Sequence, residues 1–261
     1  MLDTLEHARC DRSGAIWTVT IARESRANAL HAAAHFELAR IFDAFERDAA
    51  ARVAIVTGAG DRAFSAGNDL KVQAEGGAMD RPPSGFGGLT KRRAVKPVIA
   101  AVNGAAIGGG FEIVLACDLA IAAPHARFAL PELSHGLVPL AGMHLLPRQI
   151  GRKAAMAILL AGKALTADQA LDLGLINEIA ADRPVLEAAR ALAERIVQRS
   201  PAATAACLDI VRRSLATPDV SAALDASYES LDALRASDDF REGPLAFAEG
   251  RKPRWSHAKG E

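Results

Sequence analysis

The sequence predicts an α/β fold that ends in a helical region. Short apolar runs of strand type alternate with helical patterns over residues 1–199. Between residues 200 and 261 the apolar residues recur at helical spacing, and this part carries no chemical motif. A chain of 261 residues is also long enough to bury a substantial core. We therefore expect a core at 1–199 that holds the functional site and a helical region at 200–261.

The composition is that of an ordinary globular protein, and it argues against several functional classes. The 31 basic residues balance 31 acidic residues, so no general positive field is available to attract nucleic acid or an anionic membrane. The three cysteines are odd in number and far apart, which indicates neither a disulfide framework nor a zinc site. No apolar run approaches the length of a membrane-spanning helix, and the first residues lack the pattern of a secretory or transit peptide. We expect a cytoplasmic protein.

The first half of the chain is predicted to alternate strands and helices. Residues 16–21 are typical of a strand, a helical pattern follows at about 31–49, and a second buried strand is expected at 53–57. Residues 73–89 are rich in glycine and proline and too long for a plain connection. This segment either shapes a binding pocket or is a disordered surface excursion.

The central stretch of the sequence runs from Pro97 to Glu132. Residues 98–102 have the character of a short strand, Asn103-Gly104 is a turn signal, and three consecutive glycines follow at 108–110. The apolar segment 111–117 then indicates a buried helix. We expect a strand, a glycine loop and a helix in this order.

The second half is predicted to finish the sheet and then to become helical. A proline or glycine, or a helix-capping pattern such as Thr166-Ala167-Asp168-Gln169, marks the boundaries of several of these elements. Strands are expected at 118–122, 127–130 and 175–180, and helices at 152–161, 166–174, 185–199, 200–215 and 220–236.

The glycine loop is the first candidate for chemistry. Backbone N–H groups at the start of a helix have no partner within the helix and carry partial positive charge, so the Gly109 region can receive a developing anion. Glu112 follows about one helical turn later, which places a carboxylate on the same face. The alternative is that the glycines only permit close packing and that Glu112 is an ordinary first-turn glutamate.

Two further segments favour the chemical interpretation. The small residues between Ala63 and Leu70 follow a predicted strand and could present a second backbone N–H, at Ala66. Glu132, which follows Pro131, supplies a second carboxylate. Together these segments predict an oxyanion site with two acid–base groups.

These motifs resemble those of the crotonase (enoyl-CoA hydratase/isomerase) superfamily. Phe64 to Asp69 matches its F-S/A-A-G-x-D pattern, Gly108 to Glu112 matches G-G-G-x-E, and Glu132 matches its second glutamate. Segments 128–132 and 242–249 are most similar to the carnitinyl-CoA dehydratase subgroup. The resemblance implies a crotonase-like spiral of ββα units with a C-terminal helical region. The residues it places beside the substrate are Arg26, Ala27, Gly67, Asn68, Asp69, Leu70, Gly108, Pro131 and Gly142.

The resemblance also implies a mechanism. Ala66 and Gly109 would hold the thioester oxygen, Glu112 would activate water and Glu132 would exchange the α-proton of an acyl-CoA, as in fatty acid metabolism. No metal or redox cofactor is expected beyond the coenzyme A of the substrate, and self-association as a homotrimer or hexamer is expected. A Δ3,Δ2-enoyl-CoA isomerase and a non-catalytic binding protein with the same fold remain alternatives.

One segment departs from the family pattern. Where many hydratases carry P-G-A-G-G-T, this chain has Pro139-Leu140-Ala141-Gly142-Met143-His144. We expect this change, together with the loop at 73–89, to affect which acyl group fits.

Overall fold

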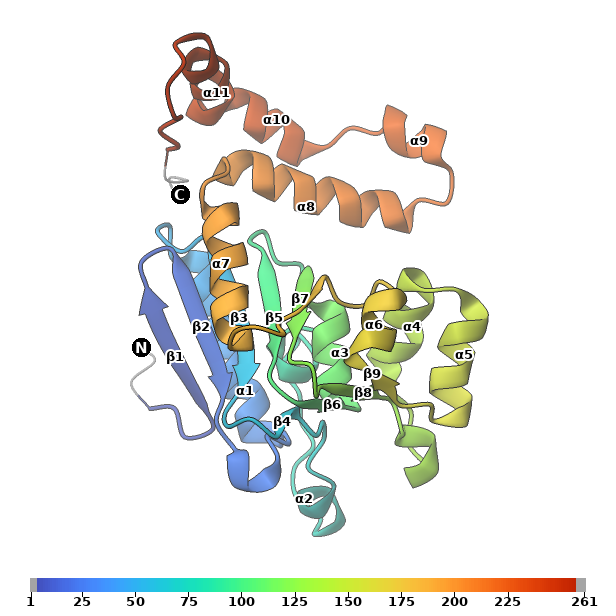
Figure 1. Cartoon of the computed structure of the whole chain (residues 1–261). Coiled ribbons are helices and arrows are strands. Elements are labelled where there is room, and N and C mark those ends of the chain that lie inside the picture. Colours follow the sequence, from blue (N-terminus) through green and yellow to red (C-terminus); the bar gives the residue numbers. More distant parts are fainter. Residues whose placement is uncertain (1–3, 257–261) are drawn as a thin grey trace.

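A six-stranded sheet lies at the centre of the structure, a computed structural model that describes residues 4–256. Its strands are ordered β1-β2-β3-β5-β7-β10, and all neighbours are parallel except the antiparallel pair β1-β2. Figure 1 shows helices around the sheet and an arm of further helices above it. The strands are β1 (Ala8–Ser13), β2 (Ile16–Ile21), β3 (Val53–Gly58), β5 (Val98–Val102), β7 (Leu119–Ala122) and β10 (Glu178–Ile179).

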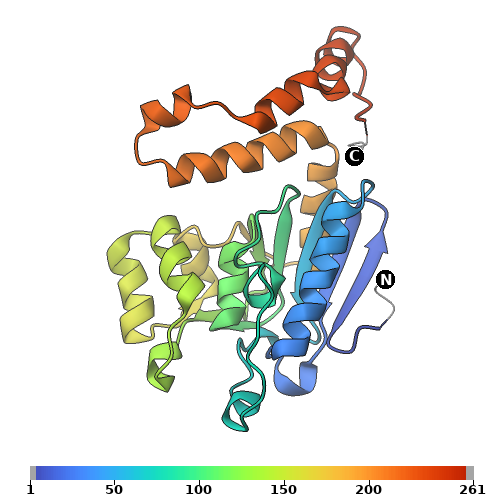
Figure 2. The same cartoon turned by 180° about the vertical axis from the view of Figure 1, so that it is seen from behind.

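Alternate residues of the inner strands face two different cores. In β3, Ala54 and Val56 belong to the core beneath α1 (Ala32–Arg47). Val53 and Ile55 pack with α7 (Val185–Val197) on the opposite face. Figure 2 shows α1 in front of the large sheet. Because both faces are covered, the parallel strands are continuous apolar runs, as the sequence indicated.

A smaller, four-stranded sheet positions the site. Three times the chain passes from a strand of the large sheet directly into a parallel strand of the small sheet, and a helix follows each time. This repeated step confirms the predicted spiral of ββα units. The small sheet contains β4 (Ala63–Ser65), β6 (Ala105–Ile107), β8 (Arg127–Ala129) and β9 (Leu165–Thr166), and the helices that follow its first three strands are α2 (Leu70–Ala74), α3 (Gly109–Ala116) and α4 (Leu140–Gln149).

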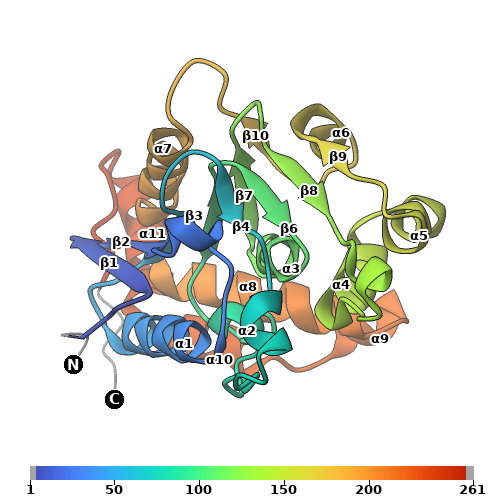
Figure 3. The same cartoon turned by 90° about the horizontal axis from the view of Figure 1, so that it is seen from below.

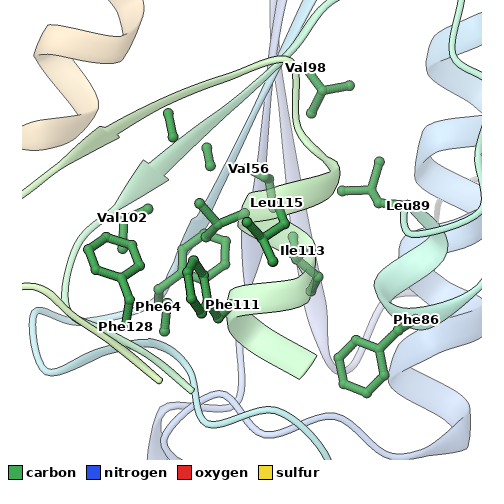
Figure 4. Close-up of a cluster of buried hydrophobic side chains, with 14 of the residues drawn as sticks. Val56, Phe64, Phe86, Leu89, Val98, Val102, Phe111, Ile113, Leu115 and Phe128 are labelled. Atoms are coloured by element: carbon green, nitrogen blue, oxygen red, sulfur yellow. The ribbon is translucent and has the colours of Figure 1, made fainter. Parts of the chain in front are cut away.

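Helix α3 is the buried helix that the sequence predicted. Its residues from Gly109 to Leu115 are all buried, and Figure 3 shows the helix in the middle of the molecule, between the small sheet and α4. Figure 4 shows Phe111 beside Phe64 and Phe128, and the ring centroids of Phe111 and Phe128 are 5.3 Å apart. A helix that is apolar on all sides is stable only when it is enclosed in this way.

The C-terminal arm consists of several helices, and one prediction fails there. The single helix expected at 220–236 is wrong, because the chain leaves the helical conformation before Tyr228. The buried Tyr228 hydroxyl donates to the carbonyl oxygen of Ala223, five residues earlier, at 2.7 Å, and this bond spans the break. Residues 257–261 of the predicted helical region lie outside the described part. The arm contains α8 (Pro201–Ala216), α9 (Val220–Asp225), α10 (Glu229–Ala236) and α11 (Asp238–Ala248).

The remaining elements agree with the sequence in part. The helices α5 (Arg152–Ala161) and α6 (Ala167–Asp172) are confirmed, with the capping box at Thr166. The strand expected at 175–180 is shorter, and the strands β1, β4, β6 and β9 and the helices α2, α4 and α11 were not predicted. Short 3-10 helices lie at η1 (Glu24–Arg26), η2 (Phe86–Gly88) and η3 (Glu132–His135). Within residues 4–256, none of the helices is both long and apolar enough to cross a membrane.

Asn103 ties together two of the bends between the sheets. Its side-chain nitrogen donates to the carbonyl oxygens of Gly58 and Gly60 at 3.0 and 2.7 Å, and its side-chain oxygen accepts from the Gly58 amide at 3.0 Å. Asn103 lies between β5 and β6, Gly58 is the last residue of β3, and Gly60 lies between β3 and β4. The side chain therefore holds two consecutive ββ corners against each other.

We expect Asn103→Ala to lower the free energy of unfolding by about 3 kcal/mol, because several main-chain groups would lose their partners. Urea unfolding followed by tryptophan fluorescence measures this change. Asn177→Ala is the control, because the Asn177 side chain accepts one hydrogen bond, from the Ala120 amide, and should cost about 1 kcal/mol. Equal losses in the two variants would contradict the role given to Asn103.

Candidate active site

Three neighbouring strands of the small sheet each lead into the site. Residues 66–69 follow β4, Gly108-Gly109 follows β6 and Pro131-Glu132 follows β8. Because these strands are parallel, their carboxyl ends open at one edge of the sheet, where α/β proteins commonly bind ligands. Motifs that are far apart in the sequence are therefore brought together.

The first candidate anion-binding group is the amide of Gly109. Gly108 has a φ of +55° and is the N-cap residue of α3, so Gly109 is the first residue of the helix. No acceptor for the Gly109 N–H is found among residues 4–256. A side chain at Gly109 would overlap the ring of Phe86, so only glycine leaves this amide accessible beneath the ring.

A second amide comes close to the first at residues 67–68. Gly67 has a φ of +81°, and a Cβ atom there would lie 2.8 Å from the Gly109 nitrogen. Gly67 and Asp69, on either side of Asn68, both pair with Leu30. The Leu30 amide donates to the Gly67 oxygen at 2.7 Å, and the Leu30 oxygen accepts from the Asp69 amide at 2.9 Å. The Asn68 N–H points away from this pairing and has no acceptor in the described part of the chain. It is the second amide available to an anion.

The predicted oxyanion role of Ala66 is wrong in this structure. The Ala66 N–H donates to the carbonyl oxygen of Ala27 at 2.9 Å, so it is already used. The chain turns at Gly67, and Asn68, which the sequence suggested only as a substrate-binding residue, presents its amide instead. The spacing of the motif does not show which side of such a turn an amide faces.

The first carboxylate, Glu112, is buried on α3. Its Oε1 accepts a hydrogen bond from the amide of Gly142 at 2.9 Å. Burial raises the pKa of the Glu112 carboxyl, while the amides of Gly142 and Ala141 and the charge of Arg81 oppose that rise. Gly142 therefore supports a carboxylate, although the sequence suggested contact with the substrate.

The second carboxylate, Glu132, begins η3 after Pro131. Its Oε2 is buried and has no hydrogen-bond partner among the described residues. Burial raises the pKa of Glu132 to about 7, and the nearby charge of Glu112 adds to this rise. The two glutamates thus have different environments, because amides solvate Glu112 and one oxygen of Glu132 lacks such a partner.

The two glutamates and the two residues whose amides lack an acceptor within residues 4–256 line one cavity. This cavity has a volume of about 380 Å³ and is bordered by Asn68, Gly109, Glu112 and Glu132. A neighbouring cavity of about 460 Å³ shares Glu112 with it. The loops expected to shape the acyl pocket line both cavities, through Arg81, Phe86 and Leu140 among others.

A third cavity, of about 680 Å³, shares Asn68 with the first. Several predicted substrate-binding residues line it, namely Arg26, Ala27, Asn68, Asp69 and Leu70. The Asp69 carboxylate is held by Arg23 at 3.0 Å and caps α2. The structure therefore gives Asp69, like Gly67 and Gly108, a part in shaping the backbone of the site.

The sequence did not indicate Arg81 and Phe86, which line two of these cavities, or Arg23, which holds Asp69. Arg81 and Phe86 lie in the irregular loop, where no periodic pattern indicates the direction of a side chain. The loop's length and its glycines were the only signal.

The profile of the family described as "Enoyl-CoA hydratase/isomerase" matches residues 11–258. The chain belongs to this family. A carnitinyl-CoA dehydratase from Salmonella arizonae is 44% identical over 260 residues, which cover 96% of this chain and 98% of that protein. A carnitinyl-CoA dehydratase from Escherichia coli O157:H7 is 41% identical, with the same coverage of both chains.

Solved structures of the enoyl-CoA hydratase/isomerase family are also similar. An enoyl-CoA hydratase from Mycobacterium marinum has a TM-score of 0.90 at 38% identity, and one from Mycobacterium tuberculosis H37Rv has a TM-score of 0.89 at 37% identity. Each alignment covers 97% of this chain and 99% of the other. The fold and the assignment as an enzyme of the hydro-lyase type are thereby confirmed.

We expect the Glu132 carboxyl to titrate near pH 7 in the free enzyme. In Glu112→Gln its pKa should fall, because the neighbouring negative charge is removed. Carbon-13 NMR of side-chain-labelled glutamate measures both values, and loss of the signal in Glu132→Gln identifies it. Glu37→Gln, a change at a buried glutamate that binds the amides of Glu6 and His7, should leave the titration unchanged. A Glu132 pKa near the ordinary 4.5 would contradict the burial described above.

Proposed function

We propose that this enzyme reversibly hydrates a 2-enoyl-CoA thioester to a 3-hydroxyacyl-CoA. The observation that carries the proposal is the convergence of two unpartnered amides and two carboxylates on one cavity. The family membership supports the substrate class. Hydration of a conjugated thioester needs these groups, because charge develops on the thioester oxygen while two protons move.

The amides of Gly109 and Asn68 would hold the thioester oxygen. Fixed donors aimed at an oxygen that gains charge lower the barrier by about 3–4 kcal/mol each. The Gly109 amide also stands at the start of α3, where the helix dipole favours negative charge.

The two glutamates would move the protons. Glu112 takes a proton from water, the water oxygen bonds to the β-carbon, and the electrons of the double bond pass towards the thioester oxygen. Glu132, which holds a proton at neutral pH more readily than an ordinary glutamate, then protonates the α-carbon. The two glutamates together carry one proton before and after the step. The reverse dehydration uses the same two groups and starts with that proton on Glu112.

The third cavity would take the coenzyme A part. Arg26, Arg62 and Lys71 line it and supply positive charge beside the exposed edge of the site. Phosphates bind well to such groups. The reaction uses no metal or redox cofactor in this proposal.

Some finer assignments stay predictions. Exposed apolar side chains on the arm, such as Leu224 and Phe247, support the expected homotrimer or hexamer. A cytoplasmic location is likewise expected. The relatives' names suggest carnitinyl-CoA as the substrate. The charges that line the 380 and 460 Å³ cavities bear on whether such a cationic acyl group fits.

We expect Glu112→Gln and Glu132→Gln each to lower the hydration rate by about 10²–10⁴-fold, because each removes one proton-transfer group. Loss of the conjugated enoyl-thioester chromophore measures the rate, and calorimetry checks that CoA-ester binding survives. Glu37→Gln is again the control. Near-wild-type turnover in either variant would remove that residue from the mechanism, and conversion of 3-enoyl to 2-enoyl thioesters without hydration would favour the isomerase.

We expect deletion of the Asn68 N–H to lower turnover by about 10²–10³-fold, as loss of an oxyanion donor does. Incorporation of the α-hydroxy acid analogue of asparagine at this position replaces the amide with an ester and keeps the side chain. The matched control is the corresponding ester at Ala66, which removes the hydrogen bond to Ala27 and should affect stability more than turnover. A larger loss of turnover at position 66 would restore the original assignment.

A further inference from the structure

The acyl side of the site carries an excess of basic residues. Apart from Glu112 and Glu132, the ionisable residues that line the 380 and 460 Å³ cavities are Arg81, Lys91 and His144. Arg81 lines both cavities. Among residues 4–256, neither Arg81 nor Lys91 forms an ion pair within 4.0 Å. Apart from the two glutamates at the reacting end, the ionisable side chains among the described residues that line these cavities are therefore all basic.

Arg81 is close to the reacting end of the substrate. Its guanidinium carbon lies over the ring of Phe86, 5.2 Å from the ring centroid. The same ring lies against Gly109, since it occupies the space that a Cβ atom there would need. Arg81 and Gly109, whose amide would bind the thioester oxygen, thus lie against the same aromatic ring.

Arg81 also places positive charge beside the aromatic ring that a cationic acyl group would use. Proteins bind quaternary ammonium groups on the faces of aromatic rings. Phe86 is the one phenylalanine, tyrosine or tryptophan among the residues that line these two cavities, and Arg81 already lies over its ring. A quaternary ammonium would meet like charge, whereas a carboxylate could accept hydrogen bonds from the guanidinium.

We propose that the acyl end of this site selects 2-enoyl-CoA thioesters with an anionic group, such as a distal carboxylate, and discriminates against quaternary ammonium groups. This inference rests on the proposed hydration of enoyl-CoA. Arg81 is the main specificity-determining residue, and Lys91 adds to the positive field.

The test uses three thioesters that differ only in the group attached to C4 of a but-2-enoyl chain. The groups are trimethylammonium, the neutral isostere tert-butyl, and carboxylate. We expect kcat/KM to be highest for the carboxylate and lowest for the cation, with at least about a tenfold difference between them. A wild-type enzyme that prefers the trimethylammonium substrate would overturn the inference.

Variants of Arg81 test whether this residue causes the charge preference. Arg81→Gln should reduce the carboxylate-to-ammonium ratio of kcat/KM by about tenfold, and Arg81→Glu should invert the order. Arg93→Gln changes an exposed arginine of the same segment and should leave the ratio unchanged. An unchanged ratio in both Arg81 variants would overturn the assignment to Arg81.

Binding separates this inference from the proposed function. Calorimetry with the saturated forms of the three thioesters measures the charge preference without turnover. If none of the enoyl thioesters is hydrated but the saturated carboxylate binds most tightly, the proposed function fails and the charge selection stands. If the neutral thioester is hydrated but the saturated ammonium binds as tightly as the carboxylate, the charge selection fails alone.

Discussion

The site depends on one close approach of two backbone segments. Gly67 passes so near the start of α3 that a Cβ atom would lie 2.8 Å from the Gly109 nitrogen. Because no side chain separates the segments, two amides from different parts of the chain can reach one cavity. A larger residue at Gly67 or Gly109 would move the two amides apart and expose the start of α3 to water.

The paired sheets produce this approach. The chain enters the small sheet three times, and β4, β6 and β8 run parallel, so each delivers the segment that follows it to the same edge. Asn103 fixes two of the corners at which the chain changes sheet. The buried phenylalanines around α3 then hold the helix against the small sheet (Figure 4). The arrangement of donors thus follows from packing at a distance from the chemistry.

The sequence predicted the elements whose pattern is local. The continuous apolar run of β3, the apolar character of α3 and the motifs around Gly109, Glu112 and Glu132 are readable without tertiary information. The identity of the second amide was not, because the turn at Gly67 determines which N–H remains free. The break before Tyr228 was also missed, because apolar residues continue at helical spacing across it; the Tyr228 hydroxyl spans the break by donating to the Ala223 carbonyl oxygen.

The charge on Arg81 links substrate choice to the state of Glu112. The guanidinium lowers the pKa of Glu112 against the effect of burial, and it also attracts an anionic acyl group. A carboxylate bound at Arg81 would partly neutralise that charge, so the pKa of Glu112 would rise on binding. The gain in affinity for an anionic substrate is therefore partly offset by a weaker tendency of Glu112 to stay ionised. The amide of Gly142 at 2.9 Å from Glu112 limits this loss, because it continues to stabilise the carboxylate when the field of Arg81 is screened.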